Sequence, residues 1–398
     1  MRVFIIFLFI IISYGENLDI TKYVTNTIPK IIVEQTNVPT KLLRMLNKDS
    51  KLLTHYNVIF KTQIKDRNQT DNYGEYNYLL QIKYTKNSLT AKLKNLISNK
   101  VVLYKRYKIP NFNTYPFMIH SLSYDINEKL GYGKAKWIKS KLVYAVSTAP
   151  KESSIFLSDV TLTYRKKIIS GGLNIFPKWA NPTQTEIYYT KLENRPVLYK
   201  YNIFTGQKSR IFSSNGMLIV SDVKKDNLLL TLAIDDQPDI YKYNLKTKKL
   251  QRITKYPGID VNGQFYGDND IVFISDRLGY PNVYQKNLLT NSISRVIFNG
   301  KNHISVTTHK DNVVVSSRET NKAFGDNTFN LLLVNRNNNI VKRLTFGGKN
   351  ILPTFSQSGD TILFIKKMRF NSQLGIIRLK ENKIFYFKLS KRMQSFDF

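Results

Sequence analysis

The chain has 398 residues, of which 42% are hydrophobic and 13% aromatic, so it can bury a large core, is not a disordered tail and has room for two ordinary domains. It contains no cysteine, which excludes disulfides, cysteine nucleophiles and thiolate metal sites. Its 61 basic and 28 acidic residues give a formal charge of +33, a balance typical of proteins that bind nucleic acid or an anionic surface.

The first element is an apolar run from Val3 to Ile12, which follows Arg2 and precedes Ser13 and Gly15. This order is typical of a cleavable secretory signal peptide, and we predict one over residues 1–15 with cleavage before residue 16. The run is shorter than the roughly 20 residues that a membrane helix needs, so a retained anchor is the less favoured alternative. Export argues against a nucleic-acid partner.

The lysines are scattered along the chain, as in "YKRYK", "KTKKL" and "LKENK", rather than gathered in one block. The favoured interpretation is therefore that these lysines lie on solvent-exposed faces of strands. Attraction for an acidic partner or for an anionic envelope surface is the alternative.

Residues 16–133 mix two hydrophobic periods. Apolar residues at every second position predict a half-buried strand over 76–84, through Tyr76, Tyr78, Leu80, Ile82 and Tyr84. Helical spacing predicts two helices, over 39–53 with Leu42, Leu46 and Leu53, and over 117–130 with Ile119, Leu122, Ile126 and Leu130. We therefore expect a small N-terminal α+β domain.

Residues 134–398 lose the helical period and repeat a β pattern. Similar segments, from "SIFLSD" to "LGIIRL", recur at intervals of 42 to 48 residues and end at Asp159, Asn202, Asn244, Asn287, Asn335 and Leu379. Each copy adds apolar strands before and after it, which makes four strands in about 43 residues, the size of a propeller blade. The sequence therefore predicts an all-β six-bladed propeller after the α+β domain.

Two segments carry predictions about the ring itself. "SDRLGYPN", residues 275–282, is expected to be the turn between the second and third strands of the fourth blade, with Gly279 and Pro281 serving its geometry. Such turns open on the same face as the connections between blades, so one face gathers the loops. "MQSFDF", residues 393–398, is expected to add the inner strand of the first blade and close the ring.

Three stretches resemble the TolB family: "FISDRLGYPNVYQKNL", "PTFSQSGDTILFI" and "DIYKYNLKTKKLQRITKYPG". Their order after a signal peptide and a small α+β domain extends the resemblance over essentially the whole chain. The inner-strand motif is largely lost in "FYGDNDIVF" and "SVTTHKDNVVV".

The resemblance implies a non-enzymatic periplasmic component of the Tol-Pal system, without a cofactor. Its partners would be the lipoprotein Pal, on the propeller, and TolA, on the mature N-terminus, with other outer-membrane lipoproteins as further candidates. It implies roles in outer-membrane integrity, in envelope constriction during cell division and in protein import. It also implies a monomer that meets the membrane only through its partners and binds no nucleic acid.

The family's contact regions map onto two parts of this chain. The TolA-binding tip would be "ENLDITKYV", in which Glu16, Leu18, Asp19 and Ile20 pair as an added β-strand. A permanently docked edge strand is the alternative for that segment. The Pal-binding loops would contain Asn174, Ser214, Asn215, Gly216, Met217, Ile259, Asp260, Val261, Asn262, His303 and Asn350.

Catalytic and metal-binding patterns were weak or lacking. No Gly-x-Ser-x-Gly is present, and too little chain follows Leu379 for a hydrolase domain. The acidic pairs "DD" at 235–236 and "GDND" at 267–270 lack the ligand spacing of a calcium loop, and "GYGKAK" lacks the residue spacing of a phosphate loop. The four histidines, His55, His120, His303 and His309, are dispersed along the chain. We expect neither catalysis nor a metal; the competing classes are a propeller enzyme and an unrelated propeller that binds an envelope polysaccharide or surface ligand.

Overall fold

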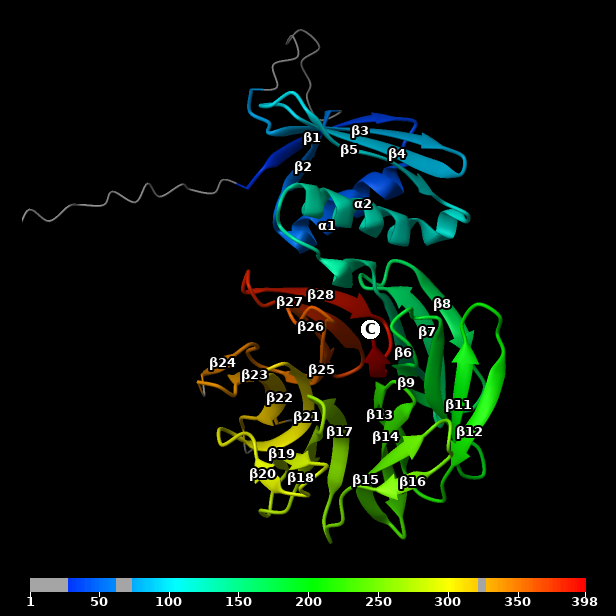
Figure 1. The fold of residues 1–398 in the computed structure, drawn as a ribbon. Coiled ribbons are helices and arrows are strands. Elements are labelled where there is room, and N and C mark those ends of the chain that lie inside the picture. The colour runs from blue at the N-terminus through cyan, green and yellow to red at the C-terminus, as the bar shows by residue number, and fades with distance from the viewer. Residues whose placement is uncertain (1–27, 62–73, 321–326, 339) are drawn as a thin grey trace, which may run out of the picture.

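The computed structural model describes residues 28–61, 74–320, 327–338 and 340–398 (Figure 1). It has two parts, a small α+β part at the N-terminal side and a β-propeller, as expected from the sequence. In Figure 1 the two helices of the α+β part lie between its sheet and the propeller. Within the described ranges, no helix has the length and apolar character needed to cross a membrane.

The α+β part is one five-stranded sheet covered by two helices. The strand order is β2-β1-β3-β4-β5, in which β1 pairs in parallel with β2 and β3, and the rest pair antiparallel. Its elements are β1 Lys30–Thr36, α1 Thr40–Leu53, β2 Asn57–Phe60, β3 Tyr78–Thr85, β4 Ser88–Asn95, β5 Val101–Lys108, the 3-10 turn η2 Phe112–Thr114 and α2 Tyr115–Lys129.

The predicted helices and strand of this part are confirmed. Leu42, Leu46 and Leu53 of α1 are buried, as are Ile119, Leu122 and Ile126 of α2, because apolar residues three and four apart share one helix face. On β3, Leu80 and Ile82 are buried, while Tyr78 and Tyr84 are half-buried beside them. Pro116 lies in the first turn of α2, where its missing N–H costs nothing.

The propeller follows a 3-10 turn, η3 Lys136–Lys139, and its described strands pair in six antiparallel groups of four, here called the first to sixth blades. The first blade is β29 Met393–Asp397, β6 Lys141–Ala149, β7 Glu152–Asp159 and β8 Arg165–Ile169. The second is β9 Leu173–Trp179, β10 Glu186–Leu192, β11 Pro196–Asn202 and β12 Lys208–Ser213. The third is β13 Leu218–Lys224, β14 Asn227–Ile234, β15 Gln237–Asn244 and β16 Leu250–Arg252.

The other three blades repeat this arrangement. The fourth is β17 Asp260–Tyr266, β18 Asp270–Ser275, β19 Asn282–Asn287 and β20 Ile293–Arg295. The fifth is β21 Lys301–His309, β22 Asn312–Arg318, β23 Phe329–Asn335 and β24 Val341–Arg343. The sixth is β25 Lys349–Phe355, β26 Thr361–Lys367, β27 Ser372–Arg378 and β28 Lys383–Leu389.

The first blade is completed by the C-terminal strand β29. It pairs antiparallel with β6, so that Met393 faces Val146 and Phe396 faces Tyr144. The prediction that residues 393–398 supply the inner strand of the first blade is confirmed. The ring is therefore closed by backbone hydrogen bonds between distant parts of the chain.

The α+β part sits on the first and sixth blades and shares a hydrophobic core with them. One cluster of buried side chains joins Leu46 of α1 and Ile119 of α2 to Leu142 of β6, Leu374 of β27 and Phe396 of β29. Arg378, at the end of β27, donates to the backbone oxygens of Leu52 and Leu53 at the end of α1, at 3.2 and 3.1 Å. This contact region, here called the seat of the α+β part, thus combines apolar packing with hydrogen bonds between the two parts.

A buried ion-pair triad crosses this seat. His120 of α2 contacts Asp49 of α1 at 2.9 Å and Asp159 of β7 at 3.1 Å, and all three side chains are fully buried. Burial alone would lower the pKa of His120, but the charge of Asp49 and the hydrogen bonds to both carboxylates outweigh it and raise the pKa to about 9. His120 is therefore a cation at pH 7 that binds one carboxylate from each part of the molecule.

Candidate functional site: the loop face of the propeller

One face of the propeller carries two kinds of connection, from the second to the third strand of a blade and from the fourth strand to the next blade. We call it the loop face; "SDRLGYPN" lies on it, between β18 and β19 as predicted. The α+β part contacts the opposite face, through Asp159 and Arg378 at the ends of third strands. The loop face is therefore not covered by the α+β part.

The loop face opens into a cavity at the centre of the ring. The cavity has a volume of about 310 Å³, and every blade contributes its inner strand to the wall, through Phe176, Ile219, Val261, Val306, Leu352 and Phe396. Polar side chains such as Lys178, Asn262 and Gln264 lie among these apolar ones. Such a mixture of apolar wall and polar groups is typical of a binding cavity.

The inner strands are locked by hydrogen bonds between neighbouring blades. Phe176, Asn262 and Leu352 adopt positive φ angles of 54°, 59° and 52° at β-bulges, which costs energy for a residue with a side chain. The backbone N–H of each donates to a hydroxyl oxygen of the adjacent blade, in Ser395, Thr231 and Ser305 respectively, at 3.0–3.1 Å. The wall of the cavity is thus preformed.

Five of the eleven residues expected in the Pal-binding loops are buried, and they are Asn174, Ser214, Asp260, His303 and Asn350. The amide of Asn174 donates to the backbone oxygens of Gly171 and Gly172, and the amide of Asn350 donates to that of Gly347. Such residues hold the connections between blades and cannot touch a partner while they stay buried.

Asp260 and His303 also belong to the interior of the loop face. Both carboxylate oxygens of Asp260 accept from one guanidinium nitrogen of Arg277 at 3.1 Å, and Arg277 also lies over the rings of Tyr256 and Tyr284. This network gives a structural role to the arginine of "SDRLGYPN", while its aspartate, Asp276, accepts from the backbone N–H of Ile259 at 2.7 Å. Burial, helped by the charge of Arg295, lowers the pKa of His303 to about 4, so it is neutral at pH 7.

The other six expected residues lie nearer the surface. Asn215, Met217 and Ile259 are exposed, and Gly216, Val261 and Asn262 are half-buried. A Cβ at Gly216 would lie 2.3 Å from the backbone oxygen of Ala233, so only glycine fits there. This close approach holds Met217 at the cavity mouth, where 46% of its surface is exposed.

Sequence reasoning missed most of the apolar surface of this face. Its loops and strand ends expose large hydrophobic side chains, namely Leu192, Met217, Ile234, Ile259, Leu278, Phe298, Ile304, Phe346, Met368 and Phe370. Among the described residues, the turns and strand ends of the opposite propeller face expose fewer, namely Phe204, Leu289, Ile293, Ile340 and Val341. The available signal was an apolar residue within a predicted polar turn, such as the phenylalanine before Asn-Gly or Gly-Gly in "RVIFNG" and "RLTFGG". A concentration of exposed apolar residues on one face is typical of a protein-binding face.

One part of the loop face is also positively charged. A hollow of about 760 Å³ beside β25 and β26 is lined by Lys349, Lys367, Arg369 and Arg392, without an acidic residue among its described lining. Burial, reinforced by the charges of Lys349 and Arg392, lowers the pKa of Lys367. Like charges held together in this way favour an acidic partner.

The remaining candidates for chemistry lie apart from one another. His55 bonds Asn127 and Glu381 at the seat of the α+β part, and the ring of His309 packs 5.8 Å from that of Phe355. Residues 235–236 and 267–269 form turns. Among the described residues, no three His, Asp or Glu side chains are arranged to hold a metal ion.

The expected TolA-binding residues Glu16, Leu18, Asp19 and Ile20 lie outside the described residues, as does the expected signal peptide.

Comparisons with known proteins agree with this architecture. The family model "TolB beta propeller domain" matches residues 128–390. A Tol-Pal system protein TolB of Campylobacter jejuni is 42% identical over 383 residues, which cover 93% of this chain and 92% of that protein. One of Helicobacter hepaticus is 37% identical over 393 residues, covering 94% and 93%. The crystal structure of TolB from Acinetobacter baumannii shares the fold, with a TM-score of 0.78 over 93% of this chain and 96% of that chain, at 20% identity.

Proposed function

The chain belongs to the TolB family and is a Tol-Pal system component, and we propose that it is a non-enzymatic adaptor of the periplasm that docks through its loop face on the lipoprotein Pal. In this role it would link Pal to TolA and so support outer-membrane integrity and constriction of the envelope during cell division. The further lipoproteins expected from the family resemblance would compete for the same face.

The observation that carries this proposal is the larger number of exposed apolar side chains on the loop face, around a preformed central cavity, than on the opposite face. Rigid loops lose little conformational entropy on docking, so more of the interaction energy appears as affinity. Burying apolar anchors in the middle of a charged rim is typical of protein interfaces. The segments 214–217 and 259–262 would supply contacts, while the buried Asn174 and Asn350 would hold the neighbouring connections of the same face in place.

We expect Ile259→Asp to weaken binding of the soluble domain of Pal about 30-fold or more, because a buried carboxylate would replace an apolar anchor worth about 2 kcal/mol. Isothermal titration calorimetry with the purified chain and the purified Pal domain measures this. Leu289→Asp is the matched control, since Leu289 belongs to the same blade, is 72% exposed and lies in the turn between β19 and β20 on the opposite face. The control should bind Pal as the unaltered chain does.

Equal weakening by both substitutions would remove the loop face as the docking surface. A wild-type chain that does not bind Pal at all, but binds an envelope polysaccharide, would replace the proposal with the alternative of a saccharide-binding propeller.

The second partner, TolA, is proposed for the mature N-terminus from the family resemblance alone. Deleting residues 16–22, which contain Glu16, Leu18, Asp19 and Ile20, should abolish TolA binding and leave Pal binding intact, since the two partners would use separate surfaces. Titration of the deleted chain with each purified partner tests this. Loss of both interactions would contradict a separate, detachable tip.

A further inference from the structure

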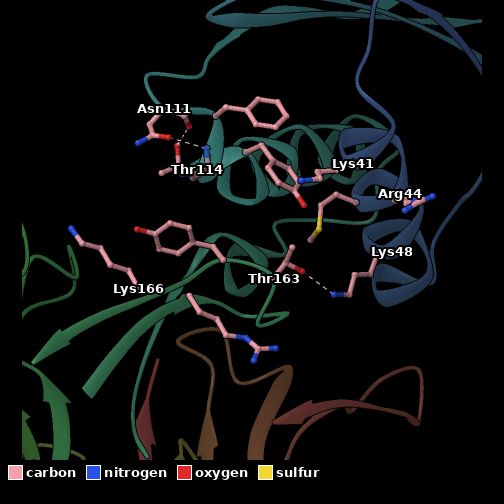
Figure 2. Close-up of a pocket in the computed structure, with 13 residues that line it drawn as sticks. Lys41, Arg44, Lys48, Asn111, Thr114, Thr163 and Lys166 are labelled. Atoms are coloured by element: carbon pink, nitrogen blue, oxygen red, sulfur yellow. Dashed lines mark hydrogen bonds between the residues drawn. The ribbon is translucent and has the colours of Figure 1, made fainter. Parts of the chain in front are cut away.

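A third cavity lies between the α+β part and the first blade, at the opposite face from the loop face (Figure 2). Its volume is about 730 Å³. One wall comes from α1 and from residues 111–115, and the other from residues 163–166, in the turn between β7 and β8 and the start of β8. We call it the seat pocket.

The seat pocket is lined by five cations and, among its described lining, by no acid. Lys41, Arg44 and Lys48 come from α1, and Arg165 and Lys166 come from β8. Figure 2 shows Lys41, Arg44 and Lys48 on one side of the hollow and Lys166 on the other. Positive charge therefore approaches the same space from both parts of the molecule.

Four of these cations have no ion-pair partner among the described residues: Lys41, Arg44, Arg165 and Lys166. Lys48 is held differently, because its ammonium donates to the backbone oxygen of Thr161 at 3.3 Å and to the hydroxyl of Thr163 at 3.0 Å. Arg165 is held in part as well, since its Nε donates to the backbone oxygen of Leu162 at 2.7 Å, which leaves its two terminal guanidinium nitrogens for a ligand. The lining thus combines two anchored cations, Lys48 and Arg165, with three further cations from the two walls.

The nearest acids do not compensate this charge. Asp49 and Asp159 influence Lys48 electrostatically, but both are fully buried behind the pocket wall and share His120. The negative charges of Asp49 and Asp159 are balanced by the positive charges of His120 and Lys48. The charges of the other four cations of the lining therefore stay uncompensated.

The chemistry of the lining selects a particular anion. Guanidinium groups donate two parallel hydrogen bonds to phosphate or carboxylate oxygens, and lysine ammonium groups act as point charges on phosphate. Tyr115 and Tyr164 add phenolic donors to the wall. Four cations on two walls are neutralised by a ligand with several negative charges close together, which a molecule with two or more phosphates provides and a single carboxylate does not.

We propose that the seat pocket binds a ligand carrying two or more phosphate groups, either a soluble phosphorylated molecule or the headgroup of a phospholipid. Such a ligand bridges α1 and β8 and so clamps the α+β part onto the first blade. This inference does not depend on the partner proposed for the loop face, which lies on the other side of the ring.

The test uses sodium tripolyphosphate as the probe, titrated into the purified chain at low and at physiological salt. The Arg165→Gln/Lys166→Gln variant should bind at least ten-fold more weakly than the unaltered chain. Lys208→Gln/Arg210→Gln is the matched control, because it removes the same charge from exposed residues of β12, the outermost strand of the next blade; it should change the affinity less than two-fold. Equal weakening by both variants, or titration without a saturable single site, would overturn the proposal in favour of diffuse attraction to a chain of charge +33.

Vesicles distinguish the two sources of phosphate. If the ligand is a lipid headgroup, vesicles containing the bisphosphate lipid cardiolipin should retain the chain in flotation, and vesicles of phosphatidylcholine should not. The pocket variant, Arg165→Gln/Lys166→Gln, should then lose retention on cardiolipin vesicles, while the β12 control keeps it. If the ligand is soluble, tripolyphosphate should bind while retention stays equal in both variants. Absence of both kinds of binding would overturn the proposal. Pal binding by the pocket variant, measured in parallel, should stay unchanged, so failure here is distinct from failure of the loop-face proposal.

Discussion

Removing residues 393–398 is expected to lower the melting temperature of the protein by several degrees or more, because it takes the inner strand out of the first blade. Met393 and Phe396 are buried in the core shared with the α+β part, and burying such side chains contributes about 1.5–3 kcal/mol each. The truncation also removes Ser395 and Asp397, which accept from the backbone N–H groups of Phe176 and Trp179 in the second blade. Thermal unfolding followed by circular dichroism measures the loss.

The matched control removes Phe398 alone, which follows β29 and is only partly buried. It should leave the melting temperature within about a degree of the full chain. The variant Asp397→Asn removes the ion pair with Lys178, at 2.9 Å, but keeps the strand β29. It should therefore lower the melting temperature less than the truncation does. An unchanged melt after removal of residues 393–398 would show that β29 does not hold the ring closed in solution.

His120→Ala is expected to destabilise the seat of the α+β part by about 3–5 kcal/mol, because it leaves Asp49 and Asp159 buried and facing each other without a cation. Urea unfolding followed by tryptophan fluorescence reports on this, since Trp137 lies in the shared core. Adding Asp49→Asn should recover part of the loss by removing one of the two buried charges. His55→Ala, at the edge of the same seat, should cost less because Glu381 keeps its contact with Arg378.

The triad also predicts a pH dependence with a definite sign. The pKa of His120 is raised to about 9 in the folded protein, against about 6.5 in an unfolded chain. Its stabilising contribution is therefore fully present below about pH 6.5 and is lost as pH rises from there to 9. The difference in unfolding free energy between the unaltered chain and His120→Ala should shrink over that range. A constant difference would contradict a protonated His120 in the triad.

The helices and strands could be predicted because their signals are local. Apolar residues at helical spacing in 39–53 and 117–130 became buried faces, and the repeat near 43 residues set the order of the propeller strands. The seat of the α+β part could not be predicted in the same way. His120, Asp49 and Asp159 lie far apart in sequence, and nothing in the pattern around each one indicates that the three side chains meet.

For the candidate site, the sequence could not show which of the expected residues are exposed. Polar residues in a turn look alike in sequence whether they face solvent or hold the turn together, so the buried anchors Asn174 and Asn350 could not be told from exposed residues. Exposed apolar residues such as Phe298 and Phe346 resemble core residues in sequence. Only the packing of the chain decides between these outcomes.

The pairing of β29 with β6 also constrains how the protein reaches its native state. β6 is made before every other propeller strand and β29 after them, so β6 stays without its partner along one edge throughout synthesis of the ring. An edge strand left in that condition favours intermolecular pairing, and contacts between such distant residues form slowly. Refolding should therefore be slow and concentration-sensitive until the two ends of the propeller meet, with aggregation as the competing process.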